Sequence, residues 1–123
     1  MDDAKAYDIE TSILFDQGQH IDVAAVAAAQ TPWWNRTLTA VNDSVVRLGV
    51  LDGDFHWHKH ENEDEFFYVV EGQLDIELED GRTVVLKPGQ ALTVPKGVMH
   101  FPKARGRTVI LMVETASVVP TGN

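Results

Sequence analysis

The sequence predicts an all-β fold, an antiparallel sandwich or barrel, from two observations. The first is strict alternation in the segment 73–79, where Leu74, Ile76 and Leu78 are separated by polar residues. A period of two is typical of a strand that is wet on one face. The second is that several short apolar or β-branched segments follow one another, separated by turns that contain Gly or Pro. Such a succession indicates a sandwich or a barrel.

The expected strands share an apolar, β-branched or aromatic composition, which favours a pleated and half-buried surface. They cover residues 45–51, 66–70, 73–79, 83–86, 91–94 and 108–113. Asp80-Gly81 predicts a hairpin turn between two of them, and turns containing Pro and Gly follow at 87–90 and 95–97. In the strand at 66–70, Phe67 and Val69 have the parity of Glu65, so we expect these three side chains to face the interior.

We divide the chain into an N-terminal arm, 1–43, a β-barrel, 44–117, and a C-terminal tail, 118–123, which together form one domain. The length of 123 residues suits a single domain. The arm is predicted to be irregular, except for a short alanine-rich helix over 23–30 with Asp22 as its N-cap. Trp33 and Trp34 follow this helix, and we expect them to pack the arm onto the barrel rather than to form a lid over a pocket.

Charge and composition exclude several classes of function. The chain has 10 Lys and Arg against 19 Asp and Glu, a net charge of −9, so we expect neither nucleic acid nor an anionic membrane surface as a partner. It contains no cysteine, which excludes disulfides, Cys-ligated zinc and thiol nucleophiles. The longest apolar run is seven residues, 23–29, whereas a membrane-spanning helix needs about 20. Because residues 1–5 are acidic where a signal peptide would be basic, we expect a cytoplasmic protein.

Four histidines carry the chemistry that the sequence offers. His56, His58 and His60 are two residues apart, so on a strand they share one face, and two imidazoles at this spacing can chelate one ion. Carboxylates follow within a few residues, and His100 stands after a later turn. The alternative is a solvated, charged loop that is rich in histidine by chance, because short motif matches have a real false-positive rate.

The spacing around these histidines resembles the two motifs of the cupin superfamily. The first, written G(x)5HxH(x)3-4E(x)6G, is matched by His58-Lys59-His60, Glu65 and Gly72. The second, written G(x)5PxG(x)2H(x)3N, is matched by Gly89, Pro95-Lys96-Gly97 and His100. Two positions depart from the pattern: Gly53 stands four residues before His58 instead of five, and Ala104 replaces the asparagine. More narrowly, the chain is similar to small single-domain bacterial cupins, often labelled mannose-6-phosphate isomerase-like.

The resemblance implies a jelly-roll barrel, also called a double-stranded β-helix, with a metal ion inside. By resemblance the ligands are His58, His60, Glu65 and His100, which leave one or two coordination positions open. This set suits one divalent transition metal ion, Fe, Mn, Ni, Co, Zn or Cu, and the sequence does not distinguish among them.

A competing register uses His56-Trp57-His58 and Glu63, but Val70 then stands where the motif has glycine. In the favoured register His56 is a pocket residue, a hydrogen-bond donor near the ion, an extra ligand, or a solvated side chain at the barrel mouth. It is the only obvious acid–base residue near the ion by parity, so we predict it as the catalytic residue.

Two functions follow from this interpretation. The first is a metal-dependent enzyme, of dioxygenase or isomerase and cyclase type, that acts on a small organic substrate. The alternative is a non-catalytic sensor or binding protein for a metal or a small ligand. In both cases we expect a homodimer, because small barrels leave an edge strand and an apolar face that a second copy can cover.

Overall fold

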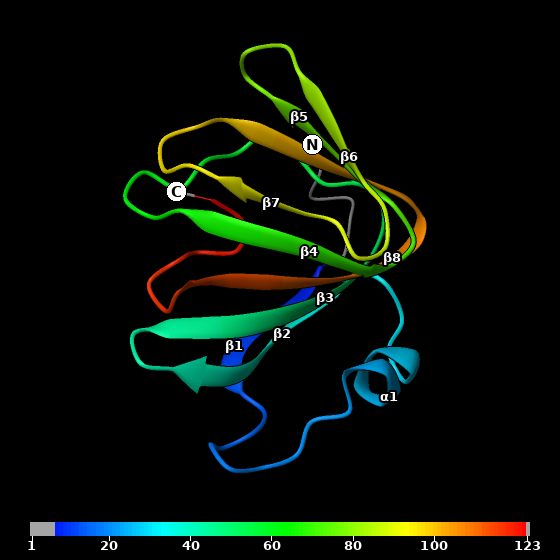
Figure 1. Ribbon diagram of the computed structural model, residues 1–123, viewed down its shortest axis with the longest axis vertical. Helices are drawn as coiled ribbons and strands as arrows, with labels where there is room; N and C mark the ends of the chain where they lie inside the picture. The colour runs from blue at the N-terminus through cyan, green and yellow to red at the C-terminus, as the bar shows by residue number, and fades with distance from the viewer. Residues whose placement is uncertain (1–6, 123) are drawn as a thin grey trace.

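The fold is a curved sheet of eight strands that wraps around its own core (Figure 1). The computed structural model describes residues 7–122; residues 1–6 and 123, the outer ends of the predicted arm and tail, lie outside it. The elements are β1 (Asp8–Ile13), α1 (Val23–Ala28), β2 (Trp34–Val41), β3 (Ser44–Asp54), β4 (Glu65–Glu71), β5 (Leu74–Leu78), β6 (Thr83–Leu86), β7 (Ala91–Val94) and β8 (His100–Thr115). The predicted all-β jelly-roll fold is confirmed.

The long strand β8 organises this sheet, because it changes partner along its length. Residues 100–104 pair with β5, whereas residues 109–113 pair with β4, and β3 lies antiparallel along the other edge. Between the two halves, Gly106 has φ +83°, a left-handed conformation that favours glycine. The change of partner joins the β5–β6 hairpin to the rest of the sheet and so helps to close the sheet around the barrel interior (Figure 1).

The core has two parts, one inside the barrel and one between the sheet and the N-terminal segment. The interior part contains Phe67 and Val69, 3% and 0% exposed, which confirms the predicted inward parity of this strand. The outer part contains Ala27 of α1 and Trp34 and Leu38 of β2. Trp34 therefore packs the N-terminal segment onto the barrel, as expected.

The N-terminal arm is more regular than we expected. The helix is present over Val23–Ala28, and Asp22 caps it by accepting a hydrogen bond from the Ala25 N–H at 3.0 Å. However, β2 forms a hairpin with β3, and β1 adds to β2 in parallel. The sequence of β2 hides this strand, because a register shift between Thr37 and Thr39 breaks the alternation that marks a strand. None of the helices within residues 7–122 is long and apolar enough to span a membrane.

Candidate metal centre

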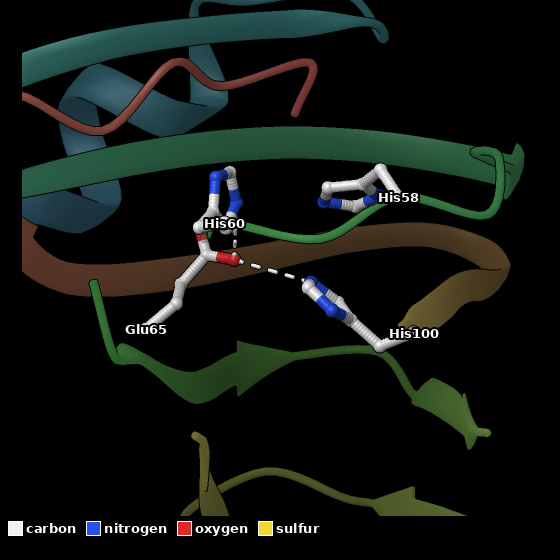
Figure 2. Close-up of side chains that lie close together, drawn as sticks. All are labelled: His58, His60, Glu65 and His100. Atoms are coloured by element: carbon white, nitrogen blue, oxygen red, sulfur yellow. Dashed lines mark ion pairs between the residues drawn. The ribbon is translucent and has the colours of Figure 1, made fainter. Parts of the chain in front are cut away.

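Four side chains from two separate segments of the sequence meet inside the barrel: His58, His60, Glu65 and His100 (Figure 2). Each offers one nitrogen or oxygen atom, and these four atoms lie within 4.8 Å of one another. All four residues are buried, with at most 7% of their surface exposed. The structure thus brings together the four residues that the resemblance assigns as ligands.

Backbone hydrogen bonds fix the positions of these residues. His58 and His100 form an isolated antiparallel bridge, in which the N–H group of each donates to the carbonyl of the other at 3.0 and 2.9 Å. The carbonyl of His60 accepts from the N–H of Gly97 at 2.8 Å, which ties the loop before β4 to the turn before β8. Glu65 is the first residue of β4, opposite Val94 of β7.

The imidazole rings are oriented by their Nδ1 atoms. Nδ1 of His58 lies 3.0 Å from the carbonyl oxygen of His56, and Nδ1 of His100 lies 2.9 Å from that of Val98. A carbonyl oxygen can only accept, so both Nδ1 atoms are donors, which leaves Nε2 as the ring nitrogen available to an ion. This arrangement of an imidazole held by a backbone carbonyl is common for metal-binding histidines.

The protonation states also suit metal binding. Burial, aided by the neighbouring His100, lowers the pKa of His58 to about 3, so the ring is neutral at neutral pH. Burial alone would raise the pKa of Glu65, but hydrogen bonds with His100 and His60 outweigh it and hold this pKa below its usual range. The Glu65 oxygen Oε1 lies 3.2 Å from Nε2 of His60 and 3.4 Å from Nε2 of His100. Neutral imidazoles and an ionised carboxylate are the forms that bind metals.

The donor set therefore fits one divalent transition metal ion. Donor atoms bound at 2.0–2.2 Å to one ion are at most about 4.4 Å apart, close to the 4.8 Å spread of this cluster. Three imidazole nitrogens with one carboxylate oxygen suit Fe, Mn, Ni, Co, Zn and Cu alike. A five- or six-coordinate ion would keep one or two positions for another ligand.

A buried pair, the cation Arg47 and the carboxyl group of Glu114, lies behind Glu65, and the sequence did not predict it. Arg47, 2% exposed, donates from Nη1 to the carboxyl of Glu114 and to the carbonyl of Val118 at 2.9 Å. Glu114 shares a hydrogen bond with Glu65, and burial together with the charge of Glu65 raises the pKa of Glu114 above its usual value. The only signal in the sequence is one charged residue in an apolar strand segment, since Arg47 interrupts the run 45–51.

A cavity reaches the cluster at His58 and Glu65. Its walls come from three parts of the chain: the N-terminal segment, the barrel strands and the C-terminal tail. They include Trp33 and Asn35 from the first part and Pro120 from the last. Trp33 packs against the barrel core, as the sequence predicted, and also contributes to a cavity wall.

His56 lies beside the cluster and is not one of its four residues. Its Nε2 is 2.8 Å from the carbonyl oxygen of Thr121, and its ring stacks on Phe55 with centroids 3.9 Å apart. The ring centroids of His56 and His58 are 5.2 Å apart, so the two side chains lie on the same side of the chain, as predicted. The catalytic role of His56 stays a prediction. Glu63, the carboxylate of the competing register, instead accepts a hydrogen bond from Ser117 at 2.8 Å.

Comparisons with known proteins agree on the fold and leave the activity open. A family model described as a cupin domain matches residues 44–114. The uncharacterised protein YdbB of Bacillus subtilis is 45% identical over 80 residues, which cover 65% of this chain and 71% of YdbB. A cupin-2 domain protein from Shewanella frigidimarina has a TM-score of 0.73 and 32% identity, covering 77% of this chain and 93% of its own. Protein NMB1881 from Neisseria meningitidis has a TM-score of 0.71 and 26% identity, covering 79% and 99%.

Proposed function

Because this chain belongs to the cupin family and four buried ligand groups adjoin a cavity, we propose that it is a metal-dependent enzyme acting on a small organic substrate. The observation that carries the proposal is the contact between cavity and cluster: both His58 and Glu65 line the cavity wall. A molecule in the cavity would reach the open coordination positions of an ion held by His58, His60, Glu65 and His100. Such an ion would supply Lewis-acid or oxygen-activating chemistry, as in a dioxygenase or an isomerase.

The protein groups around the centre have separate tasks. The Nδ1 atoms of His58 and His100 donate to backbone carbonyls, which leaves Nε2 of each ring for the ion. Arg47 and Glu114 hold the carboxylate of Glu65 from behind. Preorganised ligands of this kind keep the geometry of a site fixed during a reaction.

His56 is the residue that we propose for proton transfer. The carbonyl of Thr121 accepts the proton of its Nε2 and so fixes the ring next to His58. A general acid or base must come within hydrogen-bond reach of the reacting group, directly or through one water molecule. His56 is not among the described lining residues of the cavity, and its ring stacks on Phe55, which is one of them.

The test is turnover of a compound that depends on the metal centre. The metal-loaded protein is incubated with a bacterial metabolite extract, and mass spectrometry follows every compound. The controls are His100→Ala, which removes a ligand, and His20→Ala, which changes an exposed histidine. We expect one compound to be consumed and a product to form with the native protein and with His20→Ala only. A compound that is retained by the protein without any product would instead indicate the non-catalytic binding protein.

A further inference from the structure

We propose that the ligand of this cavity is a mainly apolar molecule that carries a flat ring, one polar group for the metal and no charged group away from the metal. The inference rests on the proposed function, because that polar group would occupy the open coordination positions. It is drawn from the composition of the walls, the packing of their aromatic rings and the charges next to the cavity.

The walls of the cavity are apolar almost throughout. Thirteen of the described residues line it, and ten of them are apolar; the other three are Asn35, His58 and Glu65. Apart from the two members of the cluster, the wall therefore offers a ligand one polar group, the amide of Asn35.

The aromatic part of the wall is flat and rigid. The rings of Trp33 and Phe55 are stacked, with centroids 5.4 Å apart and an angle of 22° between their planes. The indole N–H of Trp33 donates to the carbonyl of Asp52 at 2.6 Å, and Tyr7 packs edge-on against Trp33 with centroids 5.2 Å apart. A fixed aromatic surface favours a planar ring, which can stack on it or meet it edge-on.

The side chain of Asn35 adds one polar requirement. Its Oδ1 atom is buried and has no hydrogen-bond partner among the described residues. A buried acceptor without a donor is costly, so a hydroxyl or amine group on the ligand would stabilise this part of the wall. Asn35 lies on β2, next in sequence to Trp34, another lining residue.

The charges next to the cavity disfavour an anionic group on the ligand away from the metal. No Lys or Arg is among the described residues of the wall, and the carboxylate of Glu65 already brings a negative charge. Arg47, the buried cation behind Glu65, is engaged by Glu114 and by the carbonyl of Val118. Away from the metal, a phosphate or a carboxylate would lose its hydration without gaining a cation, which is strongly unfavourable. The part of the cavity away from the metal is therefore unsuited to the phosphate of a phosphorylated sugar.

The test compares two probes with the same chelating group, one with a ring and one without. Binding of benzohydroxamate and of acetohydroxamate to the Zn²⁺-loaded protein is measured by isothermal titration calorimetry. We expect benzohydroxamate to bind at least about ten-fold more tightly, because only its ring buries apolar surface against the wall. Trp33→Ala should weaken benzohydroxamate binding by about ten-fold and leave acetohydroxamate binding unchanged.

The matched control is Trp57→Ala, because Trp57 is 43% exposed, packs on Phe101 and is not a lining residue. If Trp33→Ala does not fold, Ile9→Arg replaces it, with Ile13→Arg as its control. Ile9 lines the cavity, whereas Ile13 on the same strand is 51% exposed. Only Ile9→Arg should weaken benzohydroxamate binding.

Equal affinities of the two probes, or equal effects of a wall variant and its control, would overturn the inference while leaving the metal centre intact. Binding of neither probe to a fully Zn²⁺-loaded protein would overturn it as well. A protein that takes up no metal would instead contradict the proposed function, and this inference with it.

Discussion

At the scale of single residues, the protonation of His58 couples the metal centre to folding. The pKa of this side chain falls from 6.5 in the unfolded chain to about 3 in the fold, chiefly through burial. Between these two values the unfolded chain binds a proton that the folded chain does not. The stability that the metal-free protein has above pH 6.5 is therefore lost progressively as the pH falls toward 3.

We predict that His58 alone contributes a slope of up to about 1.4 kcal/mol per pH unit in this window. The measurement is urea unfolding of the metal-free protein at a series of pH values, for the native chain and for His58→Gln. His58→Gln should flatten the dependence between pH 6.5 and about 4, and His20→Gln, which changes an exposed residue, should not. Identical slopes for the native chain and His58→Gln would contradict the prediction.

The buried pair of Arg47 and Glu114 gives a second prediction at this scale. A buried hydrogen-bonding group that loses its partner typically costs about 1–3 kcal/mol. We expect Arg47→Met to lower the free energy of unfolding by about this amount, because it leaves the buried carboxyl group of Glu114 without its donor. The double variant Arg47→Met with Glu114→Leu should lose less than the sum of the two single changes.

The control for this prediction is Arg82→Met, which breaks an exposed pair with Asp80 at 2.9 Å. Exposed pairs are worth about 0–1 kcal/mol, so this variant should be nearly as stable as the native chain. Chemical denaturation measures all four variants. Additive losses for Arg47→Met and Glu114→Leu would show that the two side chains are energetically independent.

These two residues also show where the sequence could not predict the site. The His and Glu ligands stand in two short motifs, so their spacing alone indicates a common centre. Arg47 and Glu114 are 67 positions apart, and only the pairing of β3 with β8 brings them together. Nothing local in the sequence encodes that pairing. The walls around Trp33 and Asn35 were missed for the same reason.

At the scale of elements, the turn between β4 and β5 is the most constrained. Gly72 has φ +84°, and a Cβ atom there would lie 2.6 Å from Thr108 Oγ1 and 2.7 Å from the carbonyl oxygen of Arg107. Gly81, in the β5–β6 hairpin, has a similar φ of +94° but open space around it. A substitution at Gly81 therefore reports backbone strain alone, whereas a substitution at Gly72 adds a steric clash.

We predict that Gly81→Ala costs only the left-handed strain, about 1–2 kcal/mol, whereas Gly72→Ala costs distinctly more because backbone atoms must also move. Thermal and chemical unfolding of the two variants provides the comparison. Equal losses of stability would mean that the close approach of β8 to this turn does not constrain it.

Prediction from sequence worked best for strands with local signals. The strands at 83–86 and 91–94 match β6 and β7 residue for residue, because turns with Gly or Pro mark both ends. The strand expected at 108–113 belongs to a longer one, β8, that begins at His100. The first part of β8 contains Pro102, Lys103 and Arg105 and shows no apolar pattern. Pairing with β5 stabilises this part of the strand. The sequence did not predict β1 and β2, because these strands depend on their pairing with each other and with β3 and not on a local signal.

At the scale of the whole molecule, we propose that two copies associate. β7 pairs only with β4, and β6 pairs only with β5, so both leave an edge within the described part of the chain. Val85 on β6 is 44% exposed and Val113 on β8 is 38% exposed. Exposed edges and apolar side chains of this kind are commonly covered by a second copy.

Light scattering at micromolar protein concentration tests this proposal. We predict a mass twice that of the chain. A monomer mass would contradict it. A dimer that dissociates on Val85→Lys and persists on Val41→Lys would place the interface at β6, because Val41 is also exposed but lies at the end of β2.

The most direct test of the central claim is the metal content of the purified and reconstituted protein, measured by element analysis. We predict about one equivalent of a divalent transition metal in the native chain and in His56→Ala, and almost none in His100→Ala or His60→Ala, each of which loses a ligand. Less than about a tenth of an equivalent in the native chain after reconstitution would contradict a metal centre in this barrel. If His56→Ala loses the metal and His60→Ala keeps it, the ligands are instead His56, His58 and Glu63.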